Sequence, residues 1–235
     1  MNAALILAGG KGERLIGRDK PKQFVEVGGE PLIAHGLRSF EACAEIARIV
    51  VVAEDRWRGL ISKCVERNGI SKFVRFADAG AARQESVFSG LLAMEDFMRA
   101  DDLAVVHDAA RPAVTERLIR ACVAEAARRD GATPVLPVRE TIYRSEDGRG
   151  VSGLLDRDEL FVGQTPEAYK FEKYLAAHRE ATREELARTR GGSEIAFRFG
   201  MDIGLFPGDE ANFKITARAD LERFERSLER GPEAE

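Results

Sequence analysis

The chain has 235 residues, of which 44% are hydrophobic and 32% are charged, enough for a single domain over residues 1–235. The formal net charge of −4 argues against a general nucleic-acid binder, whose surface is usually basic. No apolar run approaches the roughly 20 residues of a membrane span. We therefore expect neither nucleic acid, because of the net charge, nor a membrane, because of the short apolar runs, as a partner.

The apolar run at residues 3–8 has no basic segment ahead of it, so it predicts a first strand and not a signal peptide. The cysteines, Cys43, Cys64 and Cys122, are far apart and show no paired spacing. We interpret them as reduced core thiols, which is typical of a cytoplasmic protein.

Strand-like and helix-like segments alternate through the first part of the chain. Apolar runs predict buried strands, whereas apolar residues three and four apart predict helices. The predicted strands are 3–8, 46–54, 73–77 and 103–112, the last running into a loop. The predicted helices are 31–44, 56–68, 84–98 and one from Thr115 to near Gly131. This alternation predicts an α/β fold with a doubly wound, mainly parallel sheet.

The pattern changes after Val135. Residues 136–162 show alternating apolar positions and an Asp-Gly turn, which predicts a protruding β-hairpin arm. A two-stranded ribbon is marginally stable alone, so we expect the arm to pack on a second subunit. Further along, the sequence predicts a helix at 171–190, a strand, turn and strand at 203–216, and a final helix at 217–229.

Glycines follow the first predicted strand, in the stretch LILAGGKGERLIGRDKPKQF at residues 5–24. Glycine lets backbone N–H groups approach a phosphate, and ligands of open α/β sheets bind where strands end. The stretch is not a P-loop, because no Ser or Thr follows Gly-Lys, and the third glycine of a dinucleotide pattern would fall on Leu15. Arg14, Lys20 and Lys22 add positive charge beside this backbone, which predicts an electrostatic clamp for a polyphosphate.

Other candidate residues come later in the chain. Asp108 lies just past a predicted buried strand, in the expected ligand crevice, where a carboxylate can hold a metal ion or a ribose hydroxyl. We interpret its neighbour His107 as structural. Arg83 and Ser86, at a predicted helix start, either read a base or cap the helix. Lys214 lies in a predicted strand near the end of the chain, and alone it indicates little.

Eight segments occur in an order typical of one enzyme family. They are ILAGGKGERL, PKQF, RQESVFSGL, VHDAARP, PVRETI, LDRDELF, QTPEAY and NFKIT. In this order the chain resembles the 2-C-methyl-D-erythritol 4-phosphate cytidylyltransferase family, from residue 3 to about residue 228. The resemblance implies a Rossmann-like nucleotidyltransferase fold and a homodimer formed through the arm at 136–162. It also implies that CTP and a polyol phosphate are joined with release of pyrophosphate, in the non-mevalonate isoprenoid pathway, with Mg²⁺ or another divalent cation as cofactor.

The resemblance implies roles for individual residues. The catalytic residues would be Arg14, Lys22 and Lys214. The nucleotide would be bound by Ala8, Gly9, Gly10, Gly12, Gly80, Ala81 and Ser86. The polyol phosphate would be bound by Asp108, Arg111, Thr141, Arg157 and Thr165, and Asp108 would also be the metal ligand. Because the family's arm reaches across a dimer, Thr141 and Arg157 would serve the neighbouring active site.

One segment departs from the family pattern. The family usually carries Thr-Asp-Asp/Glu-Ala where this chain has Arg-Gly-Gly-Ser at residues 190–193, so both acids are missing. This departure keeps open a paralogue that binds nucleotides without turnover. A ribitol 5-phosphate cytidylyltransferase and a sugar-1-phosphate nucleotidyltransferase with another nucleotide are further alternatives, although VHDAARP and PVRET favour methylerythritol phosphate.

Overall fold

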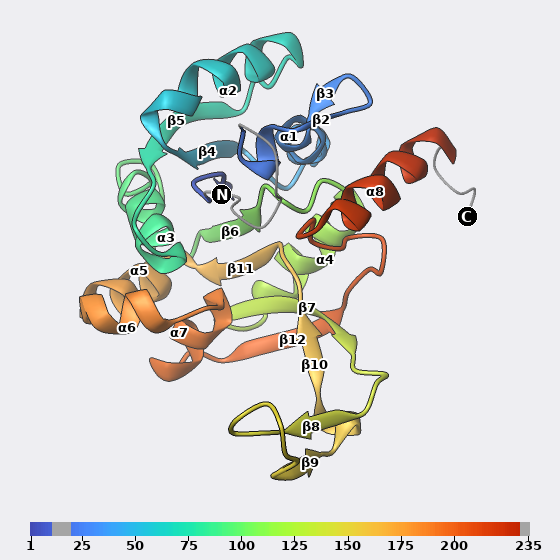
Figure 1. Cartoon of the computed structure of the whole chain (residues 1–235). Coiled ribbons are helices and arrows are strands. Elements are labelled where there is room, and N and C mark those ends of the chain that lie inside the picture. The colour runs from blue at the N-terminus through green and yellow to red at the C-terminus, as the bar shows by residue number, and fades with distance from the viewer. Residues whose placement is uncertain (11–19, 231–235) are drawn as a thin grey trace.

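A mainly parallel sheet with helices on both faces runs through the molecule (Figure 1). The structure is a computed structural model that describes residues 1–10 and 20–230. The sheet strands are β1 (Asn2–Leu7), β4 (Arg48–Ala53), β5 (Phe73–Asp78), β6 (Leu103–Asp108), β7 (Gly131–Pro137), β10 (Phe161–Gly163), β11 (Glu167–Lys170) and β12 (Ile203–Pro207). Their order is β10-β7-β11-β6-β1-β4-β5, and β12 pairs with β7. The pairings of β1 with β4 and β6, of β4 with β5 and of β12 with β7 are parallel. β10 pairs antiparallel with β7, and β11 pairs antiparallel with both β6 and β7.

The remaining elements are eight helices and a few short pieces within the described residues. The helices are α1 (Leu32–Ala42), α2 (Asp55–Arg67), α3 (Arg83–Leu92), α4 (Glu116–Ala126), α5 (Phe171–Glu180), α6 (Arg183–Arg188), α7 (Gly192–Arg198) and α8 (Arg218–Arg230). The short pieces are the 3₁₀ turns η1 (Lys22–Phe24) and η2 (Arg157–Glu159), the strand pair β2 (Glu26–Val27) and β3 (Glu30–Pro31), and the strand pair β8 (Ile142–Arg144) and β9 (Gly153–Leu155). In the part of the chain described, no helix is long and apolar enough to cross a bilayer.

Each face of the sheet has its own hydrophobic core, which explains the near-continuous apolar runs of the central strands. Along β1, Ala4 and Ile6 pack with α1, α2 and α4, whereas Ala3 and Leu5 pack with α3, α5, α6 and α7. Successive side chains of a strand point to opposite faces, so a strand covered twice needs apolar residues at every position. The predicted doubly wound α/β fold is confirmed.

Three predicted elements differ from the structure. The helix predicted at 171–190 is two helices, because Thr182 and Glu185 form a capping box that starts α6. The helix predicted at 84–98 ends at Leu92. The turns that follow contain the buried side chains of Met94 and Met98, which continue the helical spacing of apolar residues in the sequence beyond the end of the helix. The second strand predicted within 203–216 is wrong, because the backbone that carries Lys214 is irregular.

The segment between β7 and β10 forms the protruding arm (Figure 1). β8 and β9 pair antiparallel as a separate two-stranded sheet, and Tyr143 lies directly opposite Leu154. These side chains are 61% and 67% exposed. The arm thus presents apolar side chains away from both cores.

Candidate active site

A cavity of about 520 Å³ lies beyond the carboxyl ends of β1, β5 and β6. This is the edge of the sheet at which a ligand is expected. The residues that line it are Leu7, Gly9, Gly10, Lys22, Gln23, Gly80, Ala81, Ala82, Arg83, Ser86, Asp108, Ala110 and Lys214. The structure therefore brings together most of the residues predicted to act in the site. The predicted site residues Gly12 and Arg14 lie outside the described residues.

Gln23 fixes the backbone that follows β1. Its side-chain amide donates hydrogen bonds to the carbonyl oxygens of Ala8, at 2.7 Å, and Gly10, at 2.8 Å. Ala8 is itself buried beneath the cavity, with its N–H donated to Val52 O at 2.8 Å. The sequence motif PKQF contains Gln23, but nothing in the sequence shows that its amide reaches back to residues 8 and 10.

Gly9 allows the loop after β1 to approach the loop after β5. A Cβ at position 9 would lie 2.5 Å from Ala79 Cβ, which is closer than two non-bonded carbon atoms approach each other in proteins. The second loop is held in turn by Ser86, whose hydroxyl oxygen accepts a 3.0 Å hydrogen bond from Gly80 N. A further pair of bonds runs from Ala81 N and Ala82 N to the Glu85 carboxylate, at 2.8 and 3.2 Å. These contacts shape the wall of the cavity from backbone.

We expect Gly9→Ala to destabilise the protein by about 2 kcal/mol, because the new methyl group overpacks the contact with Ala79. Urea denaturation measures this change in the free energy of unfolding. The matched control is Gly59→Ala within α2, where a Cβ meets no described atom within 4 Å. Removing glycine from a helix interior should raise stability by about 0.5–1 kcal/mol. Equal effects of the two substitutions would contradict the packing argument.

Asp108 joins two cations at the floor of the cavity. Its Oδ2 accepts a 2.6 Å bond from Lys214 Nζ, and its Oδ1 lies 3.2 Å from Arg83 Nη2. Lys22 Nζ reaches the same area by donating to Ile215 O at 2.7 Å. Lys22, Arg83 and Lys214 thus surround a single carboxylate among the described residues that line the cavity. Such a surplus of positive charge suits an anionic ligand.

The charges of this cluster depend on one another. Burial opposes ionisation of Asp108, but Arg83 and Lys214 outweigh it and hold the pKa of Asp108 far below its usual range. Burial likewise opposes the charge of Arg83, and Asp108 together with Glu167 outweighs it and raises the pKa of Arg83. Asp108 and Arg83 are therefore both charged at neutral pH.

Thr165 and Arg111 lie beneath Asp108 and outside the cavity lining. The Thr165 hydroxyl accepts from Asp108 N at 3.1 Å and lies 3.1 Å from His107 Nδ1. His107 Nε2 donates to Arg111 O at 3.0 Å, so Nδ1 is the acceptor of the threonine proton. Burial lowers the pKa of His107 to about 4, which agrees with the structural role predicted for it. The guanidinium of Arg111 donates to Asn212 O at 2.8 Å and ties the site to the segment before α8.

Thr141 and Arg157 lie on the arm and do not reach this cavity. Thr141 is exposed just before β8. Arg157 begins η2 and donates to Arg139 O, at 3.1 Å, within the arm. Within the described part of this one chain, the cavity is completed without either residue.

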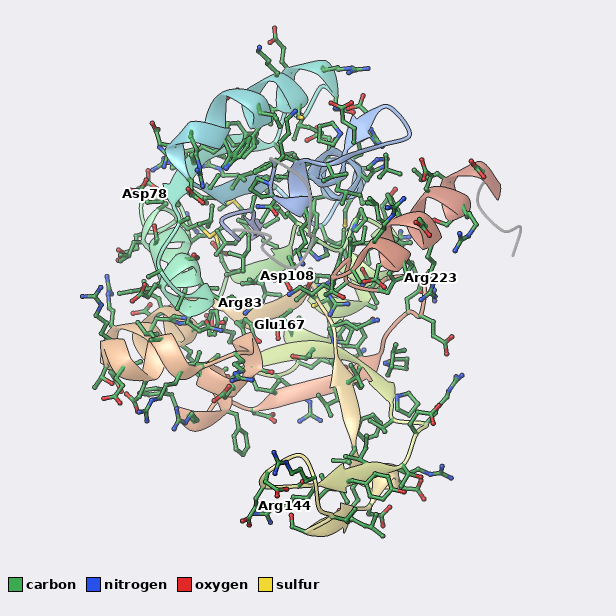
Figure 2. All side chains as sticks on the ribbon, in the orientation of Figure 1. Asp78, Arg83, Asp108, Arg144, Glu167 and Arg223 are labelled. Atoms are coloured by element: carbon green, nitrogen blue, oxygen red, sulfur yellow. The ribbon has the colours of Figure 1, made fainter. Side chains whose placement is uncertain are left out.

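Sequence reasoning missed Glu167. Figure 2 shows Arg83, Asp108 and Glu167 gathered at the centre of the molecule. Glu167 Oε2 lies 3.4 Å from Arg83 Nη2, and its Oε1 accepts from Ser193 N at 3.4 Å. The segment that departs from the family pattern therefore packs directly on this carboxylate. The QTPEAY segment contains this glutamate, but the burial of its neighbours Ala168 and Tyr169 is known only from the structure, so no sequence signal pairs Glu167 with the site.

The departing segment is also held by Gln84, which in turn contacts a buried histidine. Gln84 donates to Gly191 O at 2.9 Å, and its amide oxygen lies 3.1 Å from His178 Nε2. His178 Nδ1 lies 2.8 Å from Tyr174 O, and burial lowers the pKa of His178 to about 4. Between pH 6.5 and 4 the unfolded chain therefore binds a proton at this histidine that the folded chain does not.

We expect the free energy of unfolding to fall as the pH decreases from about 6.5 to 4, by about 1 kcal/mol per pH unit for His178 alone. Urea denaturation at several pH values in this window measures the slope. His178→Gln should flatten the slope by that amount, while His107 keeps its own contribution of the same sign. An unchanged slope in the variant would exclude a depressed pKa at His178.

Comparison with known proteins finds similarity along nearly the whole chain. The model of the family described as IspD, 2-C-methyl-D-erythritol 4-phosphate cytidylyltransferase, matches residues 2–230. The 2-C-methyl-D-erythritol 4-phosphate cytidylyltransferase of Geobacillus thermodenitrificans is 36% identical over 218 residues, covering 93% of this chain and 92% of that protein. The crystal structure of the protein of that name from Thermus thermophilus has a TM-score of 0.74 and 27% identity, covering 98% of this chain and 100% of that one. The ribitol-5-phosphate cytidylyltransferase of Streptococcus agalactiae is 29% identical over 224 residues, covering 95% and 94%.

Proposed function

Because this chain belongs to the 2-C-methyl-D-erythritol 4-phosphate cytidylyltransferase family, we propose that it joins 2-C-methyl-D-erythritol 4-phosphate to CTP and releases pyrophosphate. It is a nucleotidyltransferase, and the proposed reaction belongs to the non-mevalonate isoprenoid pathway. One observation carries the assignment of the site. Side chains from four separated segments that resemble the family, among them Lys22, Ser86, Asp108 and Lys214, line one cavity.

The proposed reaction is attack of a phosphomonoester oxygen on the α-phosphate of CTP. A phosphomonoester is mostly dianionic at neutral pH, because its second pKa is near ~6, so no general base is needed. The difficulty is that two anions must meet. Lys22 and Lys214 would supply positive charge beside the reacting phosphates, with Arg14 as a further proposed cation. Backbone groups of Gly9, Gly10 and the Gly80–Ala82 loop would position the nucleotide.

A divalent cation such as Mg²⁺ fits the residues present. Among residues 1–10 and 20–230, no three His, Cys, Asp or Glu side chains gather into a metal site. Mg²⁺ is often held by only one or two carboxylates together with substrate phosphates. A carboxylate has about four lone-pair positions, of which Lys214 and Arg83 occupy two of those on Asp108. Asp108 would therefore hold the cation, which when bound neutralises phosphate charge.

We further propose that the arm forms a homodimer and that the protein works in the cytoplasm. Support for the dimer comes from Tyr143 and Leu154, a cross-strand pair of exposed apolar side chains. Support for the compartment comes from the cysteines, all buried and unpaired in the structure. In a dimer, Thr141 and Arg157 would reach the neighbouring cavity and contact the polyol phosphate.

We expect Leu154→Asp to convert the dimer to monomers in size-exclusion chromatography, because a charge replaces apolar surface at the proposed interface. Turnover at low polyol phosphate should fall with it, since Arg157 would no longer reach a partner. Val74→Asp, which also changes an exposed apolar strand residue outside the arm, is the control. A wild-type protein that elutes as a monomer would rule out the proposed dimer.

The function is tested by pyrophosphate release from CTP with methylerythritol 4-phosphate and ribitol 5-phosphate in parallel. We expect kcat/KM to favour methylerythritol phosphate, in line with the higher identity to relatives of that name. Preference for ribitol phosphate would replace the proposed substrate. Binding of CTP without turnover of either acceptor would instead identify a nucleotide-binding paralogue.

A further inference from the structure

Glu167 contacts the cavity-lining residue Arg83 from outside the cavity lining, and the proposed reaction makes no use of it. β11 runs antiparallel to β6, and Glu167 is directly opposite Val106. Asp108 follows Val106 by two residues, so both carboxylates lie on the same face of the sheet. Glu167 is only 5% exposed, which makes a charge at this position costly without partners.

The partners of Glu167 form a chain of alternating charges. Glu167 lies 3.4 Å from Arg83, Arg83 lies 3.2 Å from Asp108, and Asp108 lies 2.6 Å from Lys214. The two carboxylates balance Arg83 and Lys214, whereas Lys22 lines the cavity beside this cluster. The Arg83 guanidinium therefore forms ion pairs with both Glu167 and Asp108, so its charge is not directed at Asp108 only.

Gly192 makes room for this arrangement. A Cβ at position 192 would collide with Glu167 Oε2 and lie 3.1 Å from the Tyr169 hydroxyl. The two positions at which the family pattern has acids, 191 and 192, are thus occupied here by glycines, and Gly192 packs against a carboxylate from β11. The negative charge at this end of the site is supplied by the sheet and not by the loop.

We propose that Glu167 is a positioning residue for the cytidylyl transfer, holding Arg83 at the cavity wall and offsetting its charge so that Asp108 remains available to Lys214. The inference rests on the proposed function of the cavity. Without the charge of Glu167, Arg83 would turn fully to Asp108, and Asp108 would hold Lys214 less firmly. The cluster of Glu167, Arg83, Asp108 and Lys214 would also gain one net positive charge.

The first test is Glu167→Gln, which keeps the shape and removes the charge. We expect kcat to fall about tenfold, the scale seen when a residue that orients a site residue, without touching the substrate itself, is replaced. The equilibrium dissociation constant for CTP, measured by calorimetry, should stay within about threefold or become tighter, because the added positive charge favours an anion. Glu172→Gln on the exposed face of α5 is the matched control and should leave both quantities unchanged.

The second test relocates the carboxylate. Glu167→Ala removes it and opens space, and Gly192→Asp in the same chain returns it from the loop side. We expect the double variant to turn over about tenfold faster than Glu167→Ala alone, the same scale as the loss in the first test. Gly192→Asp alone should be impaired because two carboxylates collide. Recovery in the double variant is a result that a purely structural role of Glu167 does not produce.

The wild-type protein separates this inference from the proposed function. Wild type that makes no cytidylylated product overturns the function itself. Wild type that is active while Glu167→Gln retains full kcat overturns only the role of Glu167. A Glu167→Gln variant in which kcat and CTP affinity fall in parallel also overturns it, because that outcome indicates general loosening of the site. If the double variant does not fold, the Glu167→Gln result alone decides.

Discussion

Substitution of Lys22 by alanine is expected to lower kcat by roughly 100-fold, the scale of removing one charge that stabilises a transition state. Lys22 lines the cavity from η1, directly after Pro21, whose fixed φ limits the backbone before it. Its Nζ donates to Ile215 O, next to Lys214, so the two proposed catalytic cations come from opposite ends of the chain to one place. Steady-state release of pyrophosphate at saturating substrates measures the loss.

The control for this prediction is Lys63→Ala, which removes a lysine from the exposed side of α2 and should leave kcat unchanged. Thermal unfolding of both variants separates catalysis from stability, because Lys22→Ala also loses a hydrogen bond to a backbone carbonyl. That bond is worth about 1.5–3 kcal/mol. Undiminished turnover in a folded Lys22→Ala protein would remove Lys22 from the mechanism.

The parts of the fold that were predictable from the sequence are those encoded by neighbouring residues. The predicted strand at 103–112, which the structure has as β6 over Leu103–Asp108, and the glycines at 9 and 10 are short local patterns, and the structure places both at the predicted crevice. β11 was missed because its four residues begin with Glu and end with Lys, and its place in the sheet is between two longer strands. A short strand of this kind is specified by its neighbours and not by its own apolar period.

The charge cluster depends on still longer separations. Arg83 and Glu167 are 84 residues apart, and Lys214 and Asp108 are 106 apart. A sequence pattern lists such residues but does not pair them, so Glu167 could not be joined to the site before the fold was known. The strand predicted around Lys214 was wrong for a related reason. The segment is held by single contacts, such as the Ile215 N bond to Ala110 O at 2.8 Å, and has no strand ladder.

The second large effect is expected for Asp108→Asn, which should reduce kcat at least ~100-fold and destabilise the folded state by about 3 kcal/mol. Asp108 is buried, and its loss leaves Arg83 with Glu167 alone and leaves Lys214 without its carboxylate. Removing one partner of a buried ion pair is costly because the remaining charge stays desolvated. Urea denaturation and pyrophosphate release, measured on the same preparation, report the two effects.

Asp78→Asn is the matched control, because Asp78 also ends a strand and also contacts an arginine, Arg58. Its side chain is 87% exposed, so this pair should contribute no more than about 1 kcal/mol, and activity should not change.

The pH dependence of stability adds a further distinction. Since the pKa of Asp108 is depressed in the folded state, its contribution is complete above the unfolded value near ~3.9 and is lost as the pH falls below it. The difference in the free energy of unfolding between wild type and Asp108→Asn should therefore be constant at neutral pH and shrink below about pH 4. A difference that persists undiminished in acid would show that the charge of the Asp108 carboxylate does not stabilise the cluster.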